Sequence, residues 1–191
     1  GYYTGDFEKN KLTIHLLGIY EDSIFGYSIC AGNFSELRGL MIANNIKIFE
    51  EKAQKHSGEF EMVLRDSMLE GIWKPYSVSS DKQKSFSLHK REAIYNNSNG
   101  SFPMASQREL SVEDVENVLP EDLKIMINEI YARYGYCFYK KEARYYFEQQ
   151  PWYMPTTTYV GNRITELEWK NMGLISEYVK YYEESLDEFG R

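Results

Sequence analysis

Three histidines are the residues of this chain best suited to bind a metal or to transfer protons near neutral pH: His15, His56 and His89. None of them has a partner at a metal-ligand spacing such as His-x-x-x-His. The sequence also contains no Gly-x-Ser-x-Gly nucleophile turn and no glycine-rich phosphate loop. We therefore predict surface histidines, no metal, no cofactor and no catalytic residue, and we expect that the protein is not an enzyme.

Four other side chains could contact a ligand or a partner: Arg133, Tyr134, Trp152 and Tyr153. The planar guanidinium of Arg133 suits a carboxylate or a phosphate, but its charge equally suits a structural role at a helix end. Trp152 and Tyr153 are adjacent aromatic residues in a predicted loop. They can stack on a sugar or grip a peptide, or they can close the core of a small domain. Both interpretations stay open.

Charge and hydropathy exclude two classes of partner. The formal net charge is −7, and no long basic stretch offsets it, so we expect no nonspecific binding of nucleic acid. No apolar run approaches the ~20 residues that a membrane-spanning helix needs.

Cys30 and Cys137 fall in different predicted halves. Two buried free thiols and a disulfide between the halves both stay open, because spacing cannot establish the close approach that a disulfide needs.

The first half of the chain alternates in the two-residue rhythm of half-buried strands, and it is rich in aromatic residues that favour strands. Eight short strands with tight turns predict a closed antiparallel β-barrel or a curved meander. Gly71-Ile72-Trp73 resembles the Gly-x-Trp signature of lipocalins but falls near the seventh strand, so the half is lipocalin-like in architecture only. The predicted strands are Tyr2–Phe7, Lys11–Tyr20, Ser23–Ala31, Glu36–Ile42, Ile46–Glu51, Glu59–Leu64, Leu69–Pro75 and Ser85–Tyr95.

The second half has the periodicity of helices. Residues 96–108 are rich in Asn, Ser and Gly, which disfavours regular structure and predicts a linker. Ser111 and Thr165 each precede an acidic residue by three positions and predict helix starts. Gly135 follows an apolar helical stripe and predicts a left-handed helix cap. The fold class is therefore α+β, with a barrel domain at 1–97, a linker at 98–109 and a small helical domain at 110–191.

The turn after that stripe reads Tyr131-Ala132-Arg133-Tyr134-Gly135, and this wording resembles the YARHG domain, with Tyr134 in place of the histidine. The resemblance covers about the last 80 residues, the span of one small domain. It implies an extracytoplasmic module of bacterial proteins without an established activity. The same resemblance continues through Phe138, Tyr146-Phe147, Trp152-Tyr153, Glu168, Asn171, Leu174 and Ile175.

Together these observations predict a noncatalytic, two-domain protein of the bacterial envelope, secreted to the periplasm or the cell surface. Its expected partner is cell-wall glycan or an envelope protein, and a lipid anchor in the precursor (a lipoprotein) stays open. One alternative is a barrel that carries a small apolar ligand inside, unless Trp73, Phe60 and Phe86 fill that space. A second alternative is an accessory module of a secreted peptidase.

Overall fold

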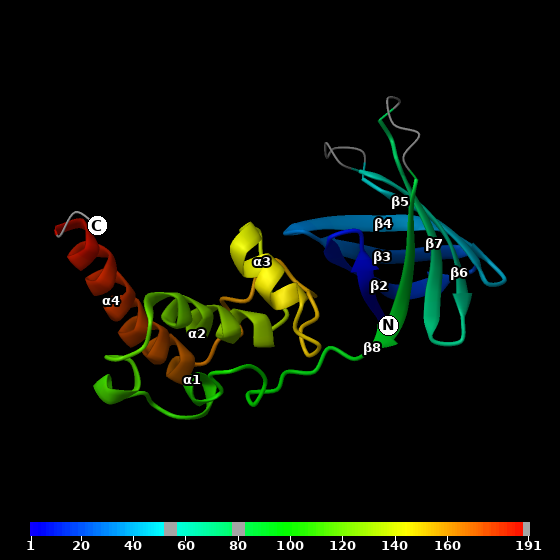
Figure 1. Ribbon diagram of the computed structural model, residues 1–191. Coiled ribbons are helices and arrows are strands. Elements are labelled where there is room, and N and C mark those ends of the chain that lie inside the picture. The colour runs from blue at the N-terminus through cyan, green and yellow to red at the C-terminus, as the bar shows by residue number, and fades with distance from the viewer. Residues whose placement is uncertain (52–56, 78–82, 189–191) are drawn as a thin grey trace. The chain divides into compact units, whose positions relative to one another are not determined.

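The computed structural model describes residues 1–51, 57–77 and 83–188, so His56, a predicted surface histidine, lies outside the described residues. The chain divides into two compact units (Figure 1). The first comprises Gly1–Ala93, Cys137–Gln149 and Met154–Thr158; the second comprises Ile94–Tyr136, Gln150–Tyr153 and the residues from Tyr159 onward. The chain therefore returns to the first unit after the motif, whereas the sequence predicts one boundary region at 98–109.

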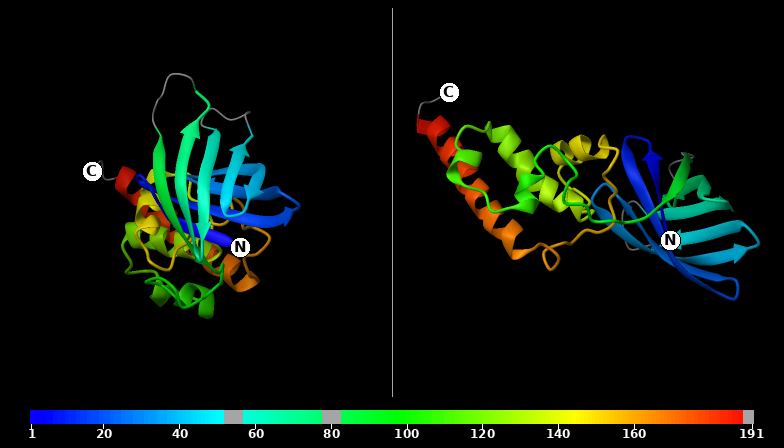
Figure 2. Two further views of the ribbon diagram at one scale, coloured as in Figure 1. Left: turned by 90° about the vertical axis from the view of Figure 1, so that its right-hand side faces the viewer. Right: turned by 90° about the horizontal axis from the view of Figure 1, so that it is seen from below.

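The first unit contains an antiparallel barrel whose strands follow the order of the sequence and close between β8 and β1. Figure 2 shows them as one strongly curved sheet. The predicted α+β fold is confirmed, and closure decides between barrel and meander. The strands are β1 (Tyr2–Phe7), β2 (Asn10–Tyr20), β3 (Ser23–Cys30), β4 (Asn33–Ile42), β5 (Asn45–Glu50), β6 (Gly58–Arg65), β7 (Met68–Pro75) and β8 (Lys84–Arg91).

The last strand is shorter than predicted. In the structure β8 ends at Arg91 instead of Tyr95, because Arg91 pairs with Tyr2 and β1 offers no partner beyond that residue.

The barrel interior is filled by side chains. The rings of Phe60 and Phe86 meet edge to face at 5.7 Å, and Phe7 meets Trp73 in the same way at 6.2 Å. Inward aliphatic residues around them are fully buried, among them Ile14, Ile24, Ile48, Leu69 and Leu88.

Gly71 of the Gly-x-Trp sequence has a packing role in β7. A Cβ at this position would lie 2.2 Å from the carbonyl oxygen of Glu61 and 2.6 Å from Cα of Met62. Because no real Cβ approaches a backbone so closely, β6 and β7 can pair here only if the residue is glycine. The tryptophan that follows two positions later points into the core.

The second unit is built from helices around a core that includes Leu123, Met126 and Ile175. Pro120 begins α2 (Pro120–Arg133), and Gly135 follows that helix with φ of 74°, which confirms the predicted glycine cap. Helix α4 (Glu166–Glu188) starts at the predicted capping box of Thr165. Within the described part of the chain, no helix combines the length and the hydropathy needed to cross a membrane.

Two local predictions need correction. The segment 98–109, predicted to lack regular structure, carries helix α1 (Met104–Gln107), whose Ala105 is fully buried in the core of the second unit. The helix predicted to start at Ser111 is only a 3-10 turn, Val112–Asp114. Helix α3 (Lys141–Glu148) belongs to the first unit. There Arg144 donates to the carbonyl oxygen of Ala31 at 3.3 Å.

Candidate functional site

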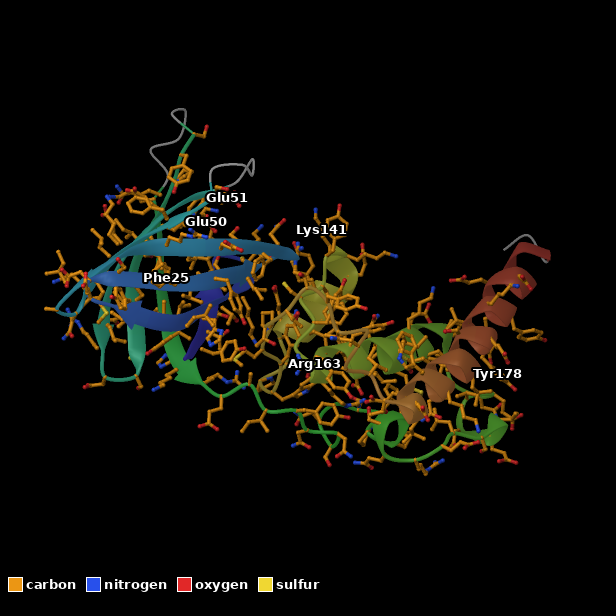
Figure 3. All side chains as sticks on the ribbon, turned by 180° about the vertical axis from the view of Figure 1, so that it is seen from behind. Phe25, Glu50, Glu51, Lys141, Arg163 and Tyr178 are labelled. Atoms are coloured by element: carbon orange, nitrogen blue, oxygen red, sulfur yellow. The ribbon has the colours of Figure 1, made fainter. Side chains whose placement is uncertain are left out.

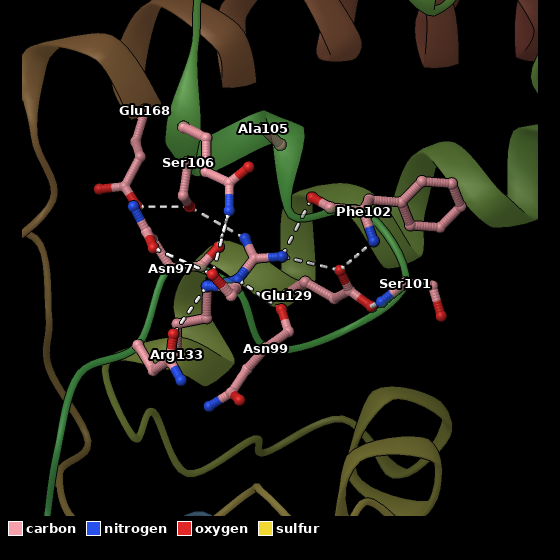
Figure 4. A network of polar contacts seen from close by, with 12 residues as sticks. Asn97, Asn99, Ser101, Phe102, Ala105, Ser106, Glu129, Arg133 and Glu168 are labelled. Atoms are coloured by element: carbon pink, nitrogen blue, oxygen red, sulfur yellow. Dashed lines mark hydrogen bonds and ion pairs between the residues drawn. The ribbon is translucent and has the colours of Figure 1, made fainter.

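Arg133, the central residue of the predicted motif, is buried on the last turn of α2 and is only 4% exposed. Its guanidinium binds α1 and the loop that precedes it (Figure 4). These bonds satisfy the donors of the buried guanidinium, as a buried charged group requires. The donors and acceptors are Nε to the Asn99 carbonyl at 2.8 Å, Nη1 to Ser106 Oγ at 2.9 Å, and Nη2 to the Phe102 carbonyl at 3.0 Å.

Glu129 neutralises Arg133 from one helical turn earlier. The two side chains are 1% exposed or less, and Nη2 lies 2.9 Å from Oε2. The carboxylate also accepts the backbone N–H groups of Ser101 at 2.6 Å and Phe102 at 2.8 Å. Gly100 lies against this carboxylate with φ of 96°, and a Cβ there would be 2.4 Å from Glu129 Cδ. Burial lowers the pKa of Arg133, and the facing Glu129 opposes that shift.

Glu168, on the first turn of α4, is the second buried carboxylate of the network and is fully buried. Ser106 connects it to the arginine, because Ser106 Oγ accepts from Arg133 and donates to Glu168 at 2.6 Å. Glu168 also accepts the hydroxyls of Tyr134 at 2.7 Å and Tyr95 at 2.9 Å, and both the N–H and the hydroxyl of Thr165. Burial alone would raise the pKa of Glu168, but these hydrogen bonds hold it below its ordinary value.

Tyr134 stands where the motif name has histidine, and its ring is 7% exposed. The ring of Tyr95 stacks on it at 4.6 Å, and the guanidinium carbon of Arg163 lies 5.5 Å from its centre. Burial and the hydrogen bond to Glu168 raise the pKa of Tyr134, so the phenol stays protonated at neutral pH. Tyrosine therefore holds the helix end to α4, as a donor with no proton to exchange near neutral pH.

Trp152 and Tyr153 lie apart from that network. Tyr153 is 1% exposed, and its hydroxyl donates to the Tyr136 carbonyl at 2.7 Å. The half-buried Trp152 ring packs against it edge to face at 6.3 Å. The structure thus brings Arg133 and Tyr134 together, and it places Trp152 and Tyr153 as a second pair. Three of the four candidate binding residues lie in the interior of the protein.

Asn171 lies on the buried face of α4 and is 1% exposed. The side-chain oxygen accepts the N–H of Leu110 at 2.9 Å, and the side-chain nitrogen donates to the carbonyls of Ala105 at 2.9 Å and Arg108 at 2.8 Å. Every partner is backbone of the segment around α1. The amide therefore fixes that segment to α4 in the same way as Arg133 fixes its earlier part to α2.

An exposed apolar surface on the barrel was not predicted. Six side chains on β2 to β5 are between 39% and 72% exposed, and we call them the outer apolar face: Leu17, Tyr20, Phe25, Leu40, Ile42 and Phe49. Ser23 pairs with both Tyr20 and Leu40, and Arg38 pairs with both Phe25 and Phe49, so the six lie on adjacent strands. Figure 3 labels Phe25 on this part of the barrel. In the sequence, this surface could have been predicted from the end of β2, where residues on both faces of the strand are apolar.

The two cysteines are free thiols in this structure, and both belong to the first unit. Cys137 Sγ accepts the N–H of Gly32 at 3.1 Å. Burial raises the pKa of Cys30 to about 12 and that of Cys137 to about 11. Both groups are therefore protonated at neutral pH, as is usual for buried cysteines that act as small apolar residues.

Metal ligands are not gathered anywhere in the described ranges, where no group of three or more His, Cys, Asp or Glu side chains could hold an ion. Of the described histidines, His15 is half-buried between aromatic rings. It stacks on Tyr2 at 3.8 Å and meets Tyr27 edge to face at 5.0 Å. Burial lowers the pKa of His15, so the ring is neutral at neutral pH.

Fold and network define a two-part protein, in which an antiparallel barrel accompanies a helical module closed by a buried arginine and two buried carboxylates. Residues 100–180, which contain α1, α2 and α3 and the first part of α4, match the YARHG domain. YARHG domains are typically extracellular, and the family has been proposed to bind peptides, which is compatible with a noncatalytic binding role. Comparisons with curated proteins and with solved structures give no match.

Proposed function

We propose that the protein is a noncatalytic binding protein of the bacterial envelope that acts outside the cytoplasm. The observation that carries this proposal is that the buried charged side chains at the YARHG motif are hydrogen-bonded to other groups of the same domain. Arg133 makes four hydrogen bonds within the domain, and Glu168 accepts five. A general acid, a general base or a nucleophile needs an accessible atom and a proton to exchange. A motif whose charged groups are all engaged internally suits a scaffold.

The barrel supports the same role through its surface. Its interior is occupied by the rings of Phe7, Phe60, Trp73 and Phe86, which favours binding on the outside over a small ligand carried within. The outer apolar face groups several large exposed side chains, an arrangement that marks interaction sites on soluble proteins. Half of the outer apolar face is aliphatic, and aliphatic groups offer no flat ring for a sugar to stack on. A protein partner therefore fits this surface better than cell-wall glycan does.

The proposed location is the periplasm or the cell surface. It is supported by the typical placement of YARHG domains. A lipid anchor in a precursor would be consistent with this location. Fractionation of cells that express the full-length gene would test it, because recovery in the cytoplasmic fraction would contradict an envelope role.

Retention on envelope material tests the binding role. We would immobilise the full chain, pass detergent-solubilised envelope proteins and sonicated peptidoglycan over it separately, and compare Leu40→Ser with the wild type. The matched control is Arg65→Ser, an exposed polar position on β6 that lies outside the outer apolar face. We expect an envelope protein to be retained by the wild type and by the control, and to be lost in the Leu40 variant.

Two results would contradict the proposal. Retention no greater than on an unrelated acidic protein, for both materials, would remove the binding role. Turnover of peptidase or glycosidase substrates above the blank would remove the noncatalytic one. Retention of peptidoglycan alone, unaffected by Leu40→Ser, would move the partner from a protein to a glycan.

A further inference from the structure

The charges of the second unit are nearly all paired. Among its described lysines and arginines, Arg163 is the one with no carboxylate within ion-pair distance. The partners of the other five are the pairs Arg108–Asp114 at 2.6 Å, Lys124–Glu183 at 2.8 Å, Arg133–Glu129 at 2.9 Å, Lys170–Glu109 and Lys180–Glu184 at 3.5 Å. Arg163 is therefore the one described cation of the second unit whose charge no carboxylate of the protein pairs with.

Arg163 is exposed but held in place. Its Nη1 donates to the Tyr134 carbonyl at 3.3 Å, and its guanidinium lies 5.5 Å from the centre of the Tyr134 ring. Figure 3 labels this side chain, which comes from the loop before α4. An arginine fixed by stacking retains the planar fork that binds a carboxylate through two parallel bonds. Because its position is already fixed, binding would require little further loss of side-chain entropy.

Aromatic and aliphatic groups accompany the arginine. The ring of Tyr95 stacks on the ring of Tyr134, the residue that holds Arg163, and Tyr95 remains 38% exposed. Ile94, the residue before it, is 70% exposed. We call Tyr95, Tyr134 and Arg163 the Arg163 platform. Its exposed groups are the Arg163 cation and the Tyr95 ring, which both contact the buried Tyr134 ring. A ligand that carries a carboxylate beside an apolar side chain would match these two groups.

We propose that the Arg163 platform binds the free C-terminal carboxylate of a peptide. The inference deepens the proposed binding function and rests on it. Several acidic side chains lie on the same unit, including Glu166 on the first turn of α4. They would repel a ligand with many carboxylates, whereas a chain end brings one carboxylate together with one apolar side chain. Tyr134, the position at which this chain departs from the motif name, supplies both the ring and the carbonyl that hold the arginine.

Fluorescence anisotropy of the full chain with labelled peptides tests the inference. The probes are three sets of random hexapeptides without Asp, labelled at the N-terminus. One set lacks Glu and ends in a free Leu carboxylate, the second is its C-terminal amide, and the third is an amide with one internal Glu. We expect the acid set to bind at least about tenfold more tightly than the amide set, as one charge-assisted bidentate contact would provide.

Variants assign the effect to the arginine. Arg163→Ala should abolish the preference for the acid set, and Arg163→Lys should keep part of it, because lysine retains the charge without the fork. Lys170→Ala is the matched control, since Lys170 is an exposed cation of the same unit that already has a partner. Inorganic phosphate should not displace the acid set.

Four results would overturn the inference: equal binding of acid and amide sets, an acid preference that survives Arg163→Ala, tighter binding of the set with internal Glu, or displacement by phosphate. If the peptides fail in these ways while an envelope protein is still retained, only the inference about Arg163 falls. If the chain retains no envelope component at all, the proposed function falls first.

Discussion

Replacing Arg133 with methionine should destabilise the second unit severely. Methionine has a similar length but leaves the Glu129 carboxylate, 1% exposed, without its counter-charge. Removing one partner of a buried ion pair typically destabilises a protein by about 3–5 kcal/mol. The total stability of a domain is only about 5–15 kcal/mol. Since about 1 kcal/mol moves the melting temperature of a domain of this size by about 4–8 °C, we expect a decrease of at least about 12 °C.

The assays are thermal unfolding, which gives the melting temperature, and urea unfolding, which gives the free energy. Both are followed by the helical circular dichroism band, because α1, α2 and α4 all belong to the second unit. The control is Lys124→Met, which removes an exposed ion pair from the same helix and should leave the midpoint nearly unchanged. Glu129→Gln added to the Arg133 variant should recover part of the loss, because it removes the uncompensated charge. A loss below about 1 kcal/mol for Arg133→Met would refute the account of this pair.

Three further predictions concern titratable groups. Hydrogen bonds that outweigh burial keep the pKa of Glu168 below its ordinary value of 4.5, so the free energy of unfolding should fall as the pH drops below 4.5 and through the folded-state pKa. In urea titrations, Glu168→Gln should flatten this decline; an unchanged slope would count against it. Burial raises the pKa of Glu148, whose Oε2 has no hydrogen-bond partner, so Glu148→Gln should stabilise the first unit at neutral pH, with the gain shrinking as the pH falls through the raised folded-state pKa toward 4.5. An equal or lower midpoint at neutral pH would refute this. Cys30 and Cys137, with pKa values raised to about 12 and 11, should react with a thiol reagent only after unfolding and without prior reduction; rapid labelling of the native protein, or no labelling of the unfolded one, would contradict it.

Local patterns in the sequence predict the elements of this fold well. The alternation of apolar residues identifies all eight strands, with ends within three residues except at the last. Gly135 and Thr165 mark a helix end and a helix start, because caps depend on neighbouring residues only. The motif Tyr131 to Gly135 identifies the YARHG domain for the same reason, since its residues are contiguous.

Long-range contacts could not be predicted in this way. Arg133 binds the Asn99–Ser106 segment, some 30 positions earlier, and no spacing rule indicates that a polar, glycine-containing stretch will wrap around a buried arginine. The same stretch forms α1, and two side chains of α4 hold it: Asn171 donates to the Ala105 carbonyl, and Glu168 accepts the Ser106 hydroxyl. Arg163 shows no distinguishing feature in the sequence. It stands out only once the ion pairs of the other cations are known.

Amide hydrogen exchange at Ser101 and Phe102 tests the buried motif most directly. Both residues lie outside helices and strands, and their N–H groups donate to Glu129 at 2.6 and 2.8 Å. If the motif is a closed scaffold, these two loop amides exchange only when the whole second unit unfolds, and Arg133→Met removes their protection. Exchange of both amides as fast as in an open loop of the wild-type protein would contradict it.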